Sequence, residues 1–243
     1  MEAKFHQVEP HGQLGREASQ EKLLSTKIAL NSGALARLNG QTDGLTIVCL
    51  GGGSGRSRPG EFGATLEWLV TRLACRFPDI GFAEIRYRVR SWRELESCVE
   101  DASAGLEAMV ATGASRCALL GFSMGGAVSV ASADHPSVSD VISLAPWLPE
   151  RLDGSTLGGR RFSVVHGQLD LSLPLVPGVS VARTRAAVDR FAARGVETSY
   201  TLIRGGLHGL ALRAPWGGLV QLPRASAWLA PIASAIERFR AEN

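Results

Sequence analysis

Leu119-Leu120-Gly121-Phe122-Ser123-Met124-Gly125-Gly126 is the stretch of sequence that decides the fold. The apolar run that it continues, Ala118–Phe122, is typical of a buried strand, and the pattern over Met124–Ala133 predicts a helix. Ser123 therefore stands in a G-x-S-x-G turn at a strand-to-helix junction. Flanking glycines relieve the clashes of such a sharp turn, which lifts the serine hydroxyl above the sheet. The N–H groups that begin the helix are expected to point toward this hydroxyl.

Strand-like and helix-like segments alternate on both sides of this junction. Strand-like runs predict strands at residues 45–50, 82–87, 118–122, 138–144, 162–166 and 198–203, and the run at residues 45–50 is typical of a buried strand. Helical periodicity predicts helices at residues 62–77, 92–111, 124–133, 181–194 and 228–240. Buried strands that alternate with helices indicate an α/β fold, with a mostly parallel sheet covered on both faces. Such sheets carry their active sites at the carboxyl ends of the strands.

The chain divides, on this pattern, into an N-terminal extension of residues 1–44 and an α/β domain of residues 45–243. Within the extension, Glu17–Leu38 has a weak helical period. Two interpretations stay open for this segment, a helix docked on the domain and a partly disordered lead-in.

Composition is that of an ordinary globular protein, with 45% hydrophobic and 20% charged residues among 243. The net charge is +3, and the arginines form small clusters without a nucleic-acid-binding motif, so we expect no nucleic-acid partner. No stretch approaches about 18 uninterrupted apolar residues, so no membrane span is expected. The N-terminus also lacks the apolar core of a secretory signal.

The four cysteines have no metal-ligand spacing, so the sequence predicts no metal site. They are Cys49, Cys75, Cys98 and Cys117. Cys49 and Cys117 fall in strand-like runs, where a free cysteine behaves as a small buried hydrophobe. This usage favours the reducing cytoplasm as the location of the protein.

The G-x-S-x-G turn and two later segments together resemble the α/β-hydrolase superfamily. These segments are His166-Gly167-Gln168-Leu169-Asp170 and Gly206-Leu207-His208, each of which follows a predicted strand. The resemblance covers residues 45–240 and is strongest to small, lidless members of the dienelactone-hydrolase-like, esterase and thioesterase groups. It implies that Ser123 is a nucleophile and that its partners follow later in the chain.

The family places its catalytic acid in a loop after a late strand, and Asp170 matches that position. A carboxylate there fixes the tautomer of the catalytic imidazole and stabilises the imidazolium that forms during attack. Glu150 and Asp153 are rivals, because some members carry the acid after the strand that here ends at Leu144.

The catalytic base is expected last in the chain order, after the final strand. His208 meets this condition, since it follows the strand at residues 198–203 and is flanked by glycines. Only an imidazole combines titration near neutral pH with two ring nitrogens, one for the serine proton and one for the carboxylate. His166 is interpreted instead as a structural residue at the end of a strand.

Two N–H donors are needed to hold an oxyanion. The backbone of Met124 is expected to supply one, and the loop Gly51-Gly52-Gly53-Ser54-Gly55 the other. The loop lacks the His-Gly pair frequent in the family, and the choice between Gly52 and Gly53 stays open. It also fits neither a Gly-Lys-[Ser/Thr] nor a G-x-G-x-x-G pattern, so no nucleotide or other cofactor is expected.

Apolar residues in three loops could line a substrate pocket: Trp147, Leu173 and Trp216. The interval from Ala145 to Arg161 is too short for a helical lid, so the site is expected to be open.

The sequence therefore predicts a serine esterase or thioesterase that acts on a small acyl substrate through the triad Ser123, His208 and Asp170. Two alternatives stay open, a triad-bearing acyltransferase, lyase or cyclase and a non-catalytic binding protein with the same fold. Neither the natural substrate nor the oligomeric state follows from the sequence.

Overall fold

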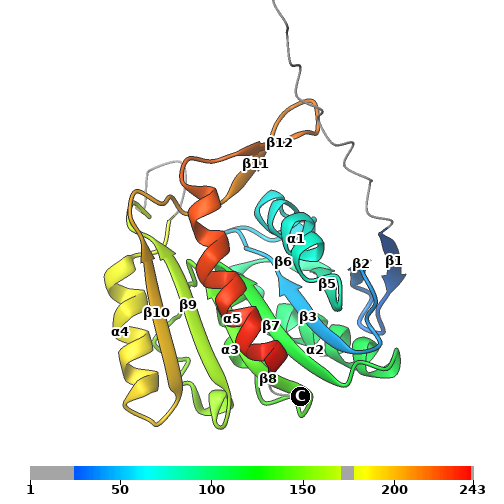
Figure 1. Cartoon of the computed structure of the whole chain (residues 1–243), viewed down its shortest axis with the longest axis horizontal. Coiled ribbons are helices and arrows are strands. Elements are labelled where there is room, and N and C mark those ends of the chain that lie inside the picture. Colours follow the sequence, from blue (N-terminus) through cyan, green and yellow to red (C-terminus); the bar gives the residue numbers. More distant parts are fainter. Residues whose placement is uncertain (1–24, 171–177, 242–243) are drawn as a thin grey trace, which may run out of the picture.

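The computed structural model of the chain describes residues 25–170 and 178–241. Its centre is one eight-stranded sheet in the order β1-β2-β5-β3-β7-β8-β9-β10 (Figure 1). β1 pairs antiparallel with β2 and β2 antiparallel with β5, whereas every other pair in this sheet is parallel. The strands are β1 Thr26–Ala29, β2 Leu35–Asn39, β3 Leu45–Leu50, β5 Ile80–Arg86, β7 Arg116–Phe122, β8 Val138–Leu144, β9 Arg161–Gly167 and β10 Glu197–Ile203. The predicted α/β class with a mostly parallel sheet is confirmed.

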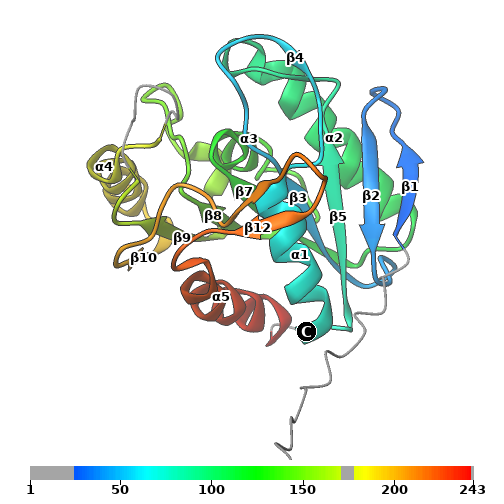
Figure 2. The same ribbon diagram turned by 90° about the horizontal axis from the view of Figure 1, so that it is seen from above.

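Helices cover both faces of the sheet (Figure 2). α1 Ala64–Arg76 and α5 Leu229–Ala241 pack on one face, while α2 Leu95–Ala111, α3 Met124–Ala131 and α4 Val181–Ala192 pack on the other. Short 3₁₀ turns precede α2 at Trp92–Glu94 and α5 at Ala225–Trp228. A third, Ser155–Leu157, is the one helical turn between β8 and β9, so no lid domain interrupts the fold there.

Two small ribbons lie outside the central sheet. β4 (Arg58–Pro59) pairs with β6 (Val89–Arg90), and β11 (Ala211–Arg213) pairs with β12 (Leu219–Gln221). The second ribbon contacts α1 and protrudes beyond the carboxyl ends of the strands (Figure 1).

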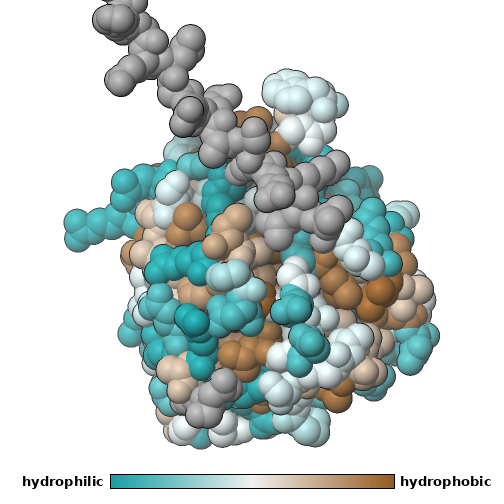
Figure 3. Space-filling view, turned by 45° about the vertical axis from the view of Figure 1, so that its right-hand side comes forward, coloured by the Kyte–Doolittle hydropathy of each residue, from teal (hydrophilic) through white to brown (hydrophobic). Residues whose placement is uncertain are grey.

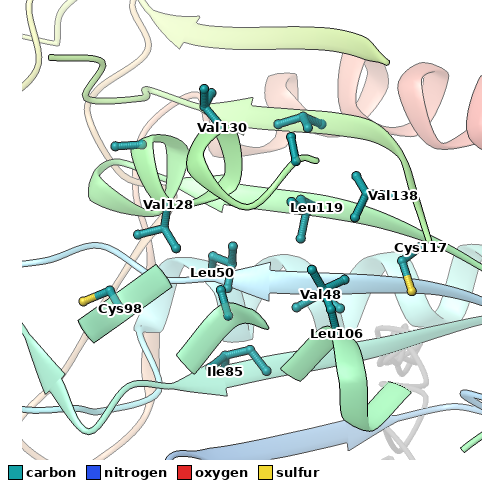
Figure 4. Close-up of a cluster of buried hydrophobic side chains, with 14 of the residues drawn as sticks. Val48, Leu50, Ile85, Cys98, Leu106, Cys117, Leu119, Val128, Val130 and Val138 are labelled. Carbon is teal, nitrogen blue, oxygen red and sulfur yellow. The ribbon is translucent and has the colours of Figure 1, made fainter. Parts of the chain in front are cut away.

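β3 shows why the sequences of the central strands are almost continuous apolar runs. All six of its residues are buried, and alternate side chains enter different cores. Val48 and Leu50 pack with Leu106 of α2 and Val128 of α3 (Figure 4), whereas Ile47 belongs to the cluster that α1 and α5 cover. Because both faces are buried, both sets of side chains are apolar apart from Thr46, whose hydroxyl donates to the carbonyl of Thr42 at 3.2 Å.

Both interpretations of Glu17–Leu38, a docked helix and a partly disordered lead-in, are wrong for residues 25–38, which form the hairpin of β1 and β2 in the central sheet. The turn uses Gly33 in the left-handed region, at φ +88°, and the N–H of Gly33 donates to the carbonyl of Leu30 at 2.8 Å. A glycine at such a position is a turn signal that interrupts any helical period. Residues 17–24 lie outside the described residues.

None of the helices within residues 25–170 and 178–241 is long and apolar enough to cross a bilayer. On the face shown in Figure 3, hydrophilic and hydrophobic residues are interspersed.

A buried ion pair ties β2 to the rest of the sheet. Arg37 of β2 forms two hydrogen bonds with the carboxylate of Glu84 on β5, Nε–Oε1 at 2.9 Å and Nη2–Oε2 at 2.7 Å. Arg37 also reaches Glu67 of α1 at 3.0 Å. Only 4% of the Glu84 side chain is exposed, and this burial raises the pKa of the carboxyl even beside the guanidinium.

We expect Arg37→Ala to lower the free energy of unfolding in urea by about 3 kcal/mol, because loss of one partner leaves a buried carboxylate without its cation. Arg76→Ala is the matched control, since it removes an exposed pair with Glu237. That variant is expected to lose less than about 1 kcal/mol. Equal losses in the two variants would contradict the structural importance of the Arg37–Glu84 pair.

Candidate active site

Ser123 occupies a strained turn between β7 and α3. Its backbone has φ 55° and ψ −116°, a positive φ that a non-glycine residue rarely adopts. Three backbone hydrogen bonds hold it there: the N–H of Ser123 donates to Leu144 at 3.0 Å, and its carbonyl accepts from Gly126 at 3.0 Å and Trp147 at 2.9 Å. Strain of this kind persists only where the surroundings fix the backbone, and it is concentrated at functional sites.

Three glycines allow the chain to pack tightly around this turn. A Cβ at Gly121 would overlap the carbonyl of Gly125, and a Cβ at Gly125 would overlap the carbonyl of Leu50 at the end of β3. A Cβ at Gly126 would overlap Pro146. The G-x-S-x-G-G pattern is therefore required by close contact with β3 and with the loop after β8.

The structure brings Ser123, His208 and Asp170 together, although they are far apart in the sequence. Nε2 of His208 lies 3.1 Å from Oγ of Ser123, and Nδ1 of His208 lies 2.8 Å from Oδ2 of Asp170. Because a carboxylate only accepts, the proton of the neutral ring belongs on Nδ1. Nε2 then presents a lone pair to the serine hydroxyl.

Two loops carry Asp170 and His208, and backbone hydrogen bonds join these loops. The N–H of Leu169 donates to Gly206 at 2.8 Å, and the N–H of Gln168 donates to Ile203 at 2.9 Å. A Cβ at Gly167 would overlap the carbonyl of Gly206, so glycine permits this close approach.

Asp170 is fully buried and accepts three hydrogen bonds. Its Oδ1 accepts from the N–H of Val179 at 2.8 Å, and its Oδ2 accepts from His208 and from Nε2 of His166 at 2.9 Å. Burial opposes ionisation, but the hydrogen bonds from His166 and His208 outweigh it and hold the pKa of the carboxyl below its ordinary value. His166 does end a strand as expected, but its contact with Asp170 is a feature that sequence reasoning missed.

Thr65, in the first turn of α1, braces the loop of His208. Its Oγ1 accepts from the N–H of Leu210 at 3.2 Å and donates to the carbonyl of Ala211 at 3.4 Å. On the other side, the ring of Phe122 packs against His208 with centroids 5.1 Å apart. Sequence reasoning missed both neighbours, and no motif identifies Thr65.

The three residues predicted as oxyanion donors are Met124, Gly52 and Gly53. Met124 begins α3, and a Cβ at Gly52 would lie 3.5 Å from Cβ of Ser123. A Cβ at Gly53 would overlap the side chain of Met124. Within the described part of the chain, no hydrogen bond acceptor contacts the N–H of Met124, Gly52 or Gly53.

The predicted pocket residues have different placements. Trp147 is half-buried, and its ring lies 6.2 Å from that of Trp92, a neighbour that sequence reasoning missed. Trp216 is 80% exposed at the tip of the β11–β12 ribbon, a placement that gives no support to a role in lining the site. Leu173 lies outside the described residues.

The rival acids lie elsewhere. Asp153 accepts from the N–H of Ser155 at 2.9 Å and pairs with Arg194 at 3.8 Å, and Glu150 is exposed. The carboxylate that contacts His208 is that of Asp170.

No description of a known protein family matches the sequence, and no curated protein sequence matches it. Solved structures do match. A predicted CIB-like hydrolase from Thermoplasma acidophilum is 17% identical with a TM-score of 0.61, over 89% of this chain and 98% of that one. A dienelactone hydrolase-like promiscuous phosphotriesterase from metagenomic libraries is 18% identical with a TM-score of 0.59, over 88% and 98%. A thermophilic esterase from Thermogutta terrifontis is 14% identical with a TM-score of 0.61, over 90% and 92%.

At this level of sequence identity, the structural matches establish the fold and not the activity. The mostly parallel sheet, with helices on both faces, agrees with these solved structures over most of the chain. The chain adopts the α/β-hydrolase fold.

Proposed function

We propose that this chain is a serine hydrolase that cleaves carboxylic esters or thioesters through an acyl-enzyme. The observation that carries the proposal is the continuous hydrogen-bonded chain from Ser123 Oγ through His208 to Asp170, at 3.1 and 2.8 Å. This hydrogen-bonded chain begins at Ser123, whose strained backbone lies in the sharp turn at the carboxyl end of β7. The hydrolases and esterases among the matching structures support the same class of reaction.

Acylation begins when Oγ of Ser123 attacks the carbonyl carbon of the substrate. His208 Nε2 takes the hydroxyl proton, and Asp170 stabilises the imidazolium because it accepts the Nδ1–H. The C–O or C–S bond then breaks as His208 returns this proton to the leaving alkoxide or thiolate. Deacylation repeats the sequence, with water as the attacking group and Ser123 as the leaving group.

The tetrahedral oxyanion would be held by the N–H of Met124 and one N–H of the glycine loop. Of the two candidates, Gly52 lies beside Cβ of Ser123, whereas Gly53 packs against Met124 and Trp92. This placement favours Gly52 as the second donor. Donors fixed in advance in this way stabilise the charge that develops in the transition state.

The acyl part of the substrate would lie against the half-buried rings of Trp147 and Trp92. Trp92 borders the glycine loop, because a Cβ at Gly53 would lie 2.9 Å from its Cδ1. The backbone of Trp147 contacts Ser123 directly. Such an apolar wall next to the nucleophile suits an aliphatic or aromatic acyl group.

Ser123→Ala tests the function. We expect wild-type protein to hydrolyse p-nitrophenyl esters or an acyl thioester and to react with a fluorophosphonate probe. The variant should lose the label and at least about 10³-fold in kcat, because the covalent pathway is removed. Ser155→Ala, an exposed serine in the 3₁₀ turn, is the control and should keep both. Full turnover and labelling in Ser123→Ala would refute the proposal.

Asp170→Asn tests the role of the acid. We expect kcat to fall by about 10³- to 10⁴-fold, since an amide no longer selects the Nδ1–H tautomer of His208. Retention of wild-type kcat in this variant would contradict the assignment of Asp170.

The same variant tests the lowered pKa of Asp170. A carboxyl with a lowered pKa in the folded chain stabilises the fold above its unfolded-state pKa of about 3.9, and this contribution is lost as the pH falls through the folded value. The stability difference between wild type and Asp170→Asn in urea should therefore shrink as the pH falls below about 4. A difference that grows on acidification would contradict the direction of the shift.

Thr65→Val tests the brace on the loop of His208. Valine keeps the shape of threonine but cannot accept from Leu210, so we expect kcat to fall by about fivefold to tenfold, the equivalent of one hydrogen bond. Thr65→Ser keeps the hydroxyl and should retain kcat within about twofold. If the two variants have the same kcat, Thr65 does not position His208.

A further inference from the structure

His166 is a second imidazole at the catalytic carboxylate. It lies near the carboxyl end of β9 with no exposed surface, and its Nε2 is 2.9 Å from Oδ2 of Asp170 and 3.2 Å from the carbonyl oxygen of Val179. Both neighbours are acceptors, so Nε2 must carry a proton. His166 is therefore a donor to the carboxylate.

Both imidazoles bind the same oxygen. Oδ2 of Asp170 accepts from His166 at 2.9 Å and from His208 at 2.8 Å, while Oδ1 accepts from the N–H of Val179. Three donors fix the carboxylate in position. Because His166 and His208 both donate to Oδ2, the hydrogen bond from His208 is weaker than it would be if His208 were the single donor to this oxygen.

The other nitrogen of His166 differs from that of His208. Nδ1 of His166 is buried and has no hydrogen-bond partner among residues 25–170 and 178–241, whereas Nε2 of His208 faces Ser123. The ring of Tyr200 lies near that of His166, with centroids 6.4 Å apart, and Cζ of Arg185 on α4 lies 5.1 Å from the centroid of the Tyr200 ring. A second proton on Nδ1 would thus meet no acceptor in the described structure. His166 can donate to Asp170 but has no path to exchange protons with the substrate.

We propose that His166 is a positioning residue that holds Asp170 and limits how strongly this carboxylate retains the protonated form of His208. The inference rests on the proposed function of the triad. Without His166, the full charge of Oδ2 would act on His208 and favour its imidazolium, which cannot accept the serine proton. The groups that face this carboxylate are the two imidazoles and the N–H of Val179, with Tyr200 and Arg185 beyond His166.

A pair of variants distinguishes the effect of the N–H donor of His166 from the effect of the volume of its side chain. His166→Leu fills the buried site without a donor, and His166→Gln retains an N–H that can reach Asp170. In His166→Leu we expect kcat to fall about tenfold, the equivalent of one hydrogen bond to a charged group, with KM within about threefold of wild type. The acid limb of the kcat/KM profile should move to higher pH by about half a unit to one unit. His166→Gln should have a kcat within about threefold of wild type, and the acid limb of its kcat/KM profile should return to the wild-type pH.

Proton NMR of ¹⁵N-histidine-labelled protein gives a readout that needs no substrate. Wild type should show two downfield N–H protons, from Nε2 of His166 and Nδ1 of His208. His166→Leu should lose the first and move the second further downfield, because His208 then has Oδ2 to itself, while His166→Gln should leave it near its wild-type position. Thermal unfolding reports whether each variant is folded, and His166→Met, which also lacks a donor, replaces the leucine variant if that one does not fold.

The proposal is overturned if the folded leucine variant keeps the wild-type acid limb and the wild-type His208 resonance, or if leucine and glutamine behave alike. If the proposed hydrolase function itself is wrong, the experiments give a different result. In that case wild type neither turns over esters nor labels at Ser123, while the two N–H resonances still report whether His166 and His208 share one carboxylate.

Discussion

The backbone of Ser123 is the constraint on which the rest of the site depends. A positive φ at a serine costs of order 1–3 kcal/mol, and the fold must supply that energy from surrounding contacts. Here the N–H and carbonyl of Ser123 are both bonded to the chain that leaves β8, and three glycines let β3, β8 and α3 close around the turn. The geometry of Ser123 is therefore set at the centre of the sheet, where the ends of β3 and β8 and the loop after β8 meet the turn.

The parallel sheet explains how residues that are 38 and 85 positions apart come within hydrogen-bond distance. β7, β9 and β10 end at the same edge, and each is followed by Ser123, Asp170 or His208, or by the loop that carries it (Figure 1). Asp170 joins the residues at this edge, because it accepts hydrogen bonds from His208 in the loop after β10 and from His166 of β9. Thr65 of α1 accepts a hydrogen bond from Leu210 in the loop of His208.

Sequence patterns predicted the parts of the fold in which local and tertiary signals agree. The central strands are buried on both faces, so their apolar runs are unambiguous. The order of Ser123, Asp170 and His208 came from the resemblance to the α/β-hydrolase superfamily, which places these residues after strand ends. The hairpin of β1 and β2 was not predicted, because the apolar spacing of Ile28, Leu35 and Leu38 also fits a helix. Its ion pair with β5 depends on a partner 47 residues away in the sequence.

The finer features of the site depend on side-chain directions that no motif encodes. Thr65 lies 145 residues from Leu210, and an ordinary threonine early in a helix carries no signal of that contact. His166 was predicted to be structural, since the spacing of His-Gly-x-x-Asp does not reveal which nitrogen meets the carboxylate. Trp216 followed His208 closely enough to suggest a pocket wall, but the ribbon of β11 and β12 carries it into solvent.

The proposed reaction requires that the Oγ of Ser123 becomes covalently acylated during turnover. Mass spectrometry of the protein after rapid acid quenching during hydrolysis of a p-nitrophenyl ester, followed by peptide mapping, detects this acyl-enzyme. We expect the chain to gain the mass of one acyl group, located on the peptide that contains Ser123, and we expect this adduct to disappear as the substrate is consumed. Turnover with no adduct at any time under conditions where deacylation is slow, or with the acyl group on a different residue, would contradict the proposed reaction.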